Sequence, residues 1–234
     1  MINFFNKLFK GTKTDFLKIV KNNLLEENKM FIVTANPEAF IFGKNDNDVN
    51  ELLLDNNTTV VADGIGIVKG AKKLGIAIEE RIPGIDIATE LLGYGSELSK
   101  TVFFLGAKQE VIDALCNVVA DKYPGLKIVG AVNGYVSDKD AVFDKMKSLK
   151  PDIVLVALGI PAQEKLIYKH LKDFEKGIFV GVGGSFDVIS GTKARAPKFF
   201  IDNNIEWLYR IAKEPNRIKR FYNNNIKFLF NLKK

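Results

Sequence analysis

The stretch IVLVALGIPAQE, residues 153–164, joins a short and continuously apolar run to a glycine-containing loop and then to a proline. An apolar run of this length is typical of a strand that is covered on both faces of a parallel sheet. Proline suits the first turn of a helix, because the amide hydrogen that it lacks has no helical partner there. The pattern predicts a buried strand over residues 153–157 and a helix that opens at Pro161–Glu164.

The same alternation extends along the chain. Residues 108–122 and 138–149 place apolar side chains at the spacing of one helical face. Strands that alternate with such helices predict an α/β fold, with a Rossmann-like, mainly parallel sheet and helices on both faces. The predicted strands are Met30–Thr34, Thr58–Ala62, Thr101–Leu105, Lys127–Gly130, Ile153–Ala157 and Ile178–Val182.

The composition restricts the chemistry. One cysteine and one histidine in 234 residues exclude an internal disulfide and a multi-histidine metal site, and they disfavour a Ser-His-Asp triad. No apolar run reaches the roughly 18 residues of a membrane-spanning helix, and the first ten residues do not resemble a signal peptide. We expect a cytoplasmic protein that is not threaded through a membrane.

The net charge of +6 comes from the end of the chain, because residues 207–234 hold eight lysines or arginines and only one acid, Glu214. We expect an α/β core over residues 1–196 and a basic, helical C-terminal appendage over residues 197–234. Its predicted second helix, over residues 217–232, has one apolar side and is typical of a segment that lies on an anionic membrane. The alternative is that this apolar side packs on the core or on another subunit.

Candidate site residues follow the predicted strands, where ligands of α/β sheets bind. Asp63 ends a strand beside Gly64 and fits a general base, or else a cap of the next helix. Gln163 offers donors and an acceptor to a sugar, unless it belongs to a surface-exposed first turn in which Glu164 favours the helix dipole. Arg210, Arg217 and Arg220 fit a diphosphate, or else form a solvated helix face.

The glycine-rich segments at 64–66 and 181–184 complete neither a dinucleotide fingerprint nor a P-loop, and tight turns explain them better. No Asp-x-Asp metal site is evident near the end of a predicted strand. We therefore expect a reaction without cofactor or metal, in which arginines meet the negative charge of a leaving group.

The ordered set of short motifs resembles the WecG/TagA/CpsF family of bacterial glycosyltransferases, and the TagA type within it, from about residue 30 to residue 220. One departure is Ala162, where many relatives carry lysine. The motifs are Thr34-x-Asn36-Pro37, Ala62-Asp63-Gly64-x-Gly66, Arg81-x-x-Gly84-x-Asp86, Phe104-Leu105-Gly106-Ala107, Tyr123-Pro124-Gly125, Gly134-Tyr135, Pro151-Asp152, Leu158-Gly159-x-Pro161-x-Gln163-Glu164, Gly181-Val182-Gly183-Gly184-x-Phe186-Asp187, Arg195-Ala196-Pro197 and Glu206-Trp207-Leu208-Tyr209-Arg210.

The resemblance implies an inverting transfer of N-acetylmannosamine from its UDP donor to undecaprenyl-diphosphate-linked N-acetylglucosamine, for the linkage unit of wall teichoic acid. It implies a location on the inner face of the cell membrane and leaves room for a homo-oligomer. Relatives use other donors, such as UDP-N-acetylmannosaminuronic acid. The roles that it implies are Asp63 as base, Thr34, Asn36, Arg81 and Gln163 in the sugar pocket, Tyr135 and Asp187 at the uridine, and Arg210, Arg217 and Arg220 over the diphosphate.

Two alternatives come from other classes of protein. A nucleotide-dependent oxidoreductase would have a similar sheet, but the incomplete fingerprint counts against it. A nucleic-acid-binding protein would stack bases on the aromatic side chains of the tail. Binding to anionic vesicles but not to oligonucleotides at physiological salt would exclude the latter, and we expect no nucleic-acid partner.

Overall fold

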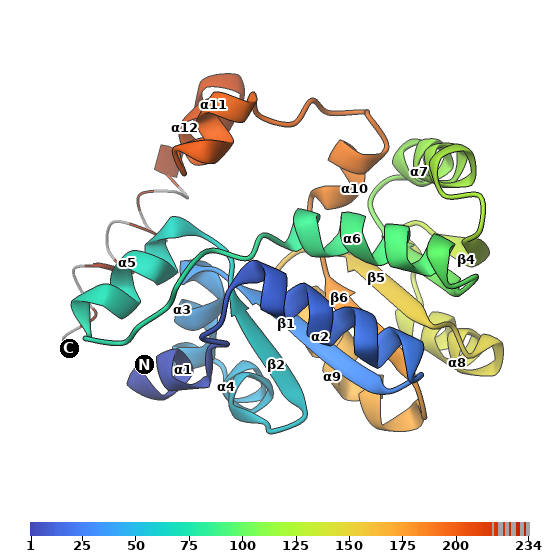
Figure 1. Cartoon of the computed structure of the whole chain (residues 1–234), viewed down its shortest axis with the longest axis horizontal. Coiled ribbons are helices and arrows are strands. Elements are labelled where there is room, and N and C mark those ends of the chain that lie inside the picture. Colours follow the sequence, from blue (N-terminus) through green and yellow to red (C-terminus); the bar gives the residue numbers. More distant parts are fainter. Residues whose placement is uncertain (217, 220–221, 223–224, 226–227, 230–231, 233–234) are drawn as a thin grey trace.

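The computed structural model describes residues 1–216, 218, 219, 222, 225, 228, 229 and 232. Its centre is a six-stranded sheet in the order β2-β1-β6-β5-β3-β4, in which every neighbouring pair is parallel (Figure 1). The predicted strands are confirmed with ends that move by at most two residues. They are β1 (Lys29–Ala35), β2 (Thr58–Ala62), β3 (Thr101–Gly106), β4 (Lys127–Val132), β5 (Ile153–Ala157) and β6 (Gly177–Gly181).

Helices cover both faces of the sheet, as the sequence predicts, and successive strand residues point to opposite faces. Phe31 and Val33 pack with one set of helices, whereas Met30 and Ile32 pack with the other set, in which α2 and α6 cross in front of the sheet in Figure 1. The first set is α1 (Ile2–Lys7), α3 (Pro37–Asn45), α4 (Asn47–Leu54), α5 (Ile65–Lys73), α8 (Lys139–Leu149) and α9 (Ala162–His170). The second set is α2 (Lys13–Leu25), α6 (Gly84–Glu97), α7 (Gln109–Lys122) and α10 (Ser185–Ile189).

The order of connections creates a switch point between β3 and β5. The chain leaves β3 through α7 toward β4 and leaves β5 through α9 toward β6, on opposite faces and in opposite directions. Such a divergence opens a crevice at the carboxyl ends of the strands. The two strands approach closely there, because a Cβ on Gly106 would lie 2.3 Å from the Ala157 carbonyl oxygen.

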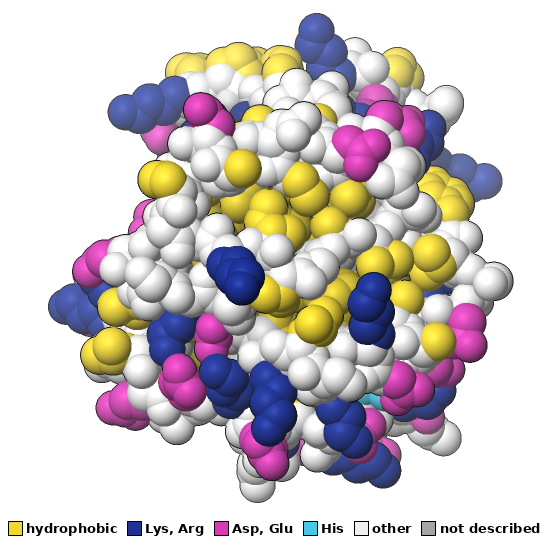
Figure 2. All heavy atoms as spheres, turned by 90° about the vertical axis from the view of Figure 1, so that its right-hand side faces the viewer, with side chains coloured by type: hydrophobic (Ala, Val, Ile, Leu, Met, Phe, Trp, Pro, Cys, Tyr) yellow, Lys and Arg dark blue, Asp and Glu magenta, His cyan; other side chains and the backbone are white. Residues whose placement is uncertain are grey.

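β4 forms one edge of the sheet and is the least covered strand. Its residues from Ile128 to Val132 are only partly buried, and Figure 2 shows apolar side chains gathered on the face that carries α7, β4 and α8.

The C-terminal segment begins with α11 (Lys198–Asp202) and α12 (Glu206–Lys213), which stand apart from the sheet in Figure 1. Both elements are helical, as expected of the start of the C-terminal appendage. The boundary expected after residue 196 lies just before α11 and stays a prediction. No helix in the described part of the chain is both long and apolar enough to cross a membrane.

The end of the chain returns to the core. Phe228 is 3% exposed and stacks on Phe5, with 6.2 Å between the ring centroids, and Leu232 is also buried. The Lys73 ammonium donates a hydrogen bond of 2.8 Å to the Leu229 carbonyl. Packing on the core, which was one alternative for the tail, therefore holds for Phe228 and Leu232. Ile218 remains exposed, and several residues of the expected second helix lie outside the described ones.

This packing predicts that the tail stabilises the fold. Phe228→Ala should lower the free energy of unfolding by about 3 kcal/mol, because a large buried ring leaves a cavity. Chemical denaturation of this variant and of Ile218→Ala, at a position that is 61% exposed, measures the difference. A loss at Phe228 no larger than the loss at Ile218 would show that the tail contributes nothing to the core.

Candidate active site

Asp63 lies directly after β2 at the carboxyl edge of the sheet and is half-buried. Its Oδ2 accepts a hydrogen bond of 3.2 Å from the backbone amide of Gly84, the first residue of α6. The next helix, α5, begins after Gly64, which has a φ of 118°, and no side chain caps it. The alternative that Asp63 caps the next helix is therefore wrong, and its carboxylate ties β2 to α6 instead.

Charged side chains from two distant parts of the sequence surround Asp63. The Arg81 guanidinium lies 3.7 Å from a Glu206 carboxylate oxygen, and the other oxygen of Glu206 accepts a hydrogen bond from Arg210. Arg81 and Glu206 are largely buried, with side chains 14% and 8% exposed. α12 thus brings an acid and a base from the C-terminal segment to the end of β2.

The protonation of Asp63 depends on this cluster. Burial raises the pKa of the Asp63 carboxyl above its ordinary value, and the negative charge of Glu206 raises it further. Arg81, the Gly84 amide and Arg210 act in the opposite direction, with Arg81 the strongest of the three. A carboxylate whose pKa is raised accepts a proton more readily, as a general base must.

Two further predicted residues lie beside Asp63. Thr34 is the last residue but one of β1 and is buried. Its hydroxyl donates a hydrogen bond of 3.2 Å to the Gly181 carbonyl, and a Cβ on Gly84 would lie 3.3 Å from this hydroxyl. Asn36 caps α3 by accepting a hydrogen bond of 3.0 Å from the Ala39 amide. The structure therefore brings Thr34, Asn36, Asp63 and Arg81 together at the ends of β1 and β2.

Gln163 is placed differently from the sequence expectation. It is 2% exposed, and its Oε1 accepts hydrogen bonds of 3.1 Å from the amides of both Gly159 and Gly183. Its Nε2 donates a hydrogen bond of 2.7 Å to Glu164. The alternative of a surface-exposed first turn is wrong, because both side chains are buried. Gln163 ties the loop after β5 to the loop after β6.

Glu164 is the residue that sequence reasoning missed. It is 3% exposed, and its Oε2 has no hydrogen-bond partner among the described residues. Burial raises the pKa of its carboxyl to about 7, against a smaller opposing effect of the hydrogen bond from Gln163. Gly181 makes room for the pair, since a Cβ there would lie 2.6 Å from the Gln163 amide nitrogen. The signal in the sequence was a glutamate directly after Gln163 in the first turn of a helix that follows a buried strand.

The profile of the glycosyl transferase WecG/TagA/CpsF family matches residues 2–234, which is nearly the whole chain. The chain belongs to this family. Three relatives are each named an N-acetylglucosaminyldiphosphoundecaprenol N-acetyl-beta-D-mannosaminyltransferase. The relative from Bacillus spizizenii W23 is 42% identical over 88% of this chain and 80% of its own. The relative from Bacillus subtilis 168 is 36% identical over 88% and 81%, and that from Staphylococcus aureus MW2 is 38% identical over 82% and 76%.

The remaining residues marked by the WecG/TagA/CpsF motifs lie elsewhere on the carboxyl edge or outside the described residues. Tyr135 follows β4 and is 75% exposed. Asp187 lies in α10, where its carboxylate is 3.4 Å from the Lys193 ammonium. Neither contacts the Asp63 cluster in the described part of the chain. Arg217 and Arg220 lie outside the described residues.

Asp86, the last residue of the motif that begins at Arg81, forms ion pairs with two other segments of the chain. Its carboxylate binds Lys13 of α2 at 3.2 Å and Arg195 of the segment before α11 at 2.5 Å. It therefore links the start of α6 to two segments far away in the sequence. Among the described residues, no group of three or more His, Cys, Asp or Glu side chains could hold a metal ion.

The burial of Glu164 predicts a pH-dependent stability. Because its pKa is about 7 in the folded protein against an ordinary 4.5, the folded state binds the proton more tightly. This contribution is complete below pH 4.5 and is lost as the pH rises through 7. Relative to Glu164→Gln, the unfolding free energy of the unchanged protein should fall by about 3 kcal/mol between pH 5 and pH 8.

Urea denaturation across this pH range measures that difference, with Glu110→Gln on α7 as the control at an exposed side chain. A gap between the unchanged protein and Glu164→Gln that does not vary with pH would mean that Glu164 is not protonated on folding.

Proposed function

We propose that this protein transfers N-acetylmannosamine from UDP-N-acetylmannosamine to undecaprenyl-diphosphate-linked N-acetylglucosamine, with inversion at the anomeric carbon. The product is the disaccharide of the linkage unit of wall teichoic acid. The observation that carries the proposal is the half-buried Asp63 between two arginines, at the carboxyl edge of a parallel sheet in a chain of the WecG/TagA/CpsF family. The names of the three relatives support the same donor sugar and acceptor.

In the proposed reaction, Asp63 takes the proton from the 4-hydroxyl of the acceptor sugar as its oxygen attacks the anomeric carbon of N-acetylmannosamine. The bond from that carbon to the β-phosphate oxygen breaks, and UDP leaves with the electron pair. The raised pKa of Asp63 suits this step, because the acid that forms is less strong than an ordinary aspartic acid.

The charge that develops on UDP needs cations nearby. Arg81 and Arg210 are both held by Glu206, so the cluster keeps two guanidinium groups at the end of β2. Fixed positive groups that are oriented before the reaction stabilise a leaving diphosphate without the cost of reorganisation. We propose that Arg210, with Arg217 and Arg220, takes the place that a metal ion holds in other glycosyltransferases.

The donor nucleotide is assigned to the switch point between β3 and β5. Tyr135 after β4 and Asp187 after β6 lie on the two sides of that crevice in strand order and remain the proposed contacts of the uridine. Thr34, Asn36, Arg81 and Gln163 remain the proposed residues of the sugar pocket, with Gln163 acting through the two glycine loops that it joins. The basic tail and the lipid-linked acceptor support a location on the inner face of the cell membrane.

A donor screen tests this function. The protein is incubated with a short-chain lipid-diphosphate N-acetylglucosamine and, in separate reactions, with UDP-N-acetylmannosamine, UDP-N-acetylglucosamine or UDP-N-acetylmannosaminuronic acid, each with and without excess EDTA. Mass spectrometry should detect product with the first donor only, and EDTA should leave its rate unchanged. Product with the uronic acid donor alone would mean that UDP-N-acetylmannosaminuronic acid, and not UDP-N-acetylmannosamine, is the donor. A loss of rate in EDTA that magnesium restores would refute the role given to the arginines.

A further inference from the structure

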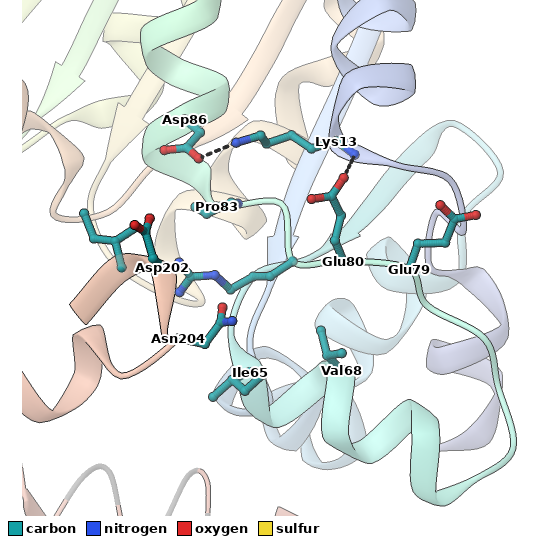
Figure 3. A pocket seen from close by; sticks show the side chains of 11 residues that line it. Lys13, Ile65, Val68, Glu79, Glu80, Pro83, Asp86, Asp202 and Asn204 are labelled. Carbon is teal, nitrogen blue, oxygen red and sulfur yellow. Dashed lines mark hydrogen bonds and ion pairs between the residues drawn. The ribbon is translucent and has the colours of Figure 1, made fainter. Parts of the chain in front are cut away.

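A cavity of about 370 Å³ lies on the outer side of the Asp63 cluster. Four segments enclose it: the start of α2, α5, the stretch of residues 79–86, and the turn between α11 and α12. Figure 3 shows Asp202 and Asn204 reaching in from the C-terminal segment, with Ile65 and Val68 on α5 and Pro83 across from them. The C-terminal segment therefore forms one wall, and the α/β core forms the others.

Two of the segments that line the cavity also carry groups of the proposed reaction centre. Arg81 lines it and also pairs with Glu206. Pro83, another lining residue, directly precedes Gly84, whose amide holds Asp63. Ile65 follows Asp63 by two residues and begins α5. Asp63 does not itself line the cavity, so a molecule there would contact the segments that hold the proposed base.

The lining suits an uncharged, polyhydroxylated ring better than a phosphate. Four lining carboxylates stand against two lining cations, and Arg195 from outside the lining pairs with Asp86, so a small negative excess remains that disfavours an anion. The amide of Asn204 and the carboxylate of Asp202 can bind hydroxyl and acetamido groups. Apolar side chains on α5 offer contacts for the carbon–hydrogen faces of a sugar. The charged lining residues are Glu79, Glu80, Asp86, Asp202, Lys13 and Arg81.

Two such rings meet at the reaction centre, one from the donor and one from the acceptor. In an inverting displacement, the attacking hydroxyl and the leaving UDP lie on opposite sides of the anomeric carbon. The nucleotide crevice between β5 and β3 is three to four strand spacings from β2, roughly 14 to 19 Å. The cavity is lined by α5, which follows β2, and by the start of α6, which packs on Thr34 of β1. It therefore lies at the β2 and β1 side of the sheet, away from that crevice.

We propose that this cavity binds the N-acetylglucosamine ring of the lipid-linked acceptor and presents its hydroxyl to Asp63, with Asp202 and Asn204 as residues that select the acceptor. The assignment rests on the proposed function. It gives the α11–α12 turn a role in substrate recognition that is separate from the arginines of the tail.

Two variants test the assignment with little risk to the fold. Asn204 has a φ of 56°, so Asn204→Gly removes the amide and keeps a backbone conformation that glycine adopts readily. Asp202→Asn removes one exposed charge. Asp144→Asn on α8 is the matched control, since Asp144 is an exposed acid on a helix that does not line the cavity.

The measurement is steady-state transfer with separate KM values for the short-chain acceptor and for UDP-N-acetylmannosamine. Each cavity variant should raise the acceptor KM by about tenfold, as the loss of one hydrogen bond to substrate does, and should leave the donor KM within about twofold. Val68→Phe, which fills the cavity from α5, should raise the acceptor KM as well.

The outcomes separate this inference from the proposed function. If the unchanged protein makes no product, the function itself is refuted. If it makes product and the three variants leave the acceptor KM unchanged, the cavity does not bind the acceptor. A rise confined to the donor KM would also overturn the assignment and place the donor sugar in the cavity.

Discussion

The site depends on the electrostatic balance around one half-buried carboxylate. Asp63 stands at the end of a buried strand, where loss of water raises its pKa, and the charges of Arg81 and Arg210 offset part of that effect. The two arginines are held in turn by Glu206. Glu206 and Arg210 come from α12, whereas Asp63 and Arg81 come from the α/β core. The site therefore needs both the core and the C-terminal segment to be complete.

The parallel sheet sets the geometry within which this balance works. Its six strands end at one edge, so side chains and loops far apart in the sequence meet there. At the ends of β5 and β6, Gln163 accepts hydrogen bonds from the amides of Gly159 and Gly183 and donates one to Glu164. Gly181 leaves the space for this pair. The buried amide and carboxyl therefore fix two loops of the site from beneath.

The sequence predicts the sheet well and the surroundings of the site less well, for physical reasons. Continuously apolar runs such as residues 153–157 identify strands that are covered on both faces, and their order places Asp63, Thr34 and Asn36 at one edge. The burial of Gln163 and Glu164 could not be predicted, because it depends on the loops after β5 and β6 that close over them. The same holds for Phe228, whose ring reaches Phe5 across more than two hundred residues.

The central claim is that Asp63 removes the proton of the acceptor, and the turnover of Asp63→Asn tests it most directly. Asparagine keeps an oxygen that can accept the Gly84 amide hydrogen, so the tie between β2 and α6 is preserved while the base is lost. We predict that kcat falls by about 10²–10⁴-fold while the KM for the UDP donor and the midpoint of unfolding stay close to those of the unchanged protein. A variant whose kcat stays within a few-fold of the original would contradict this role of Asp63.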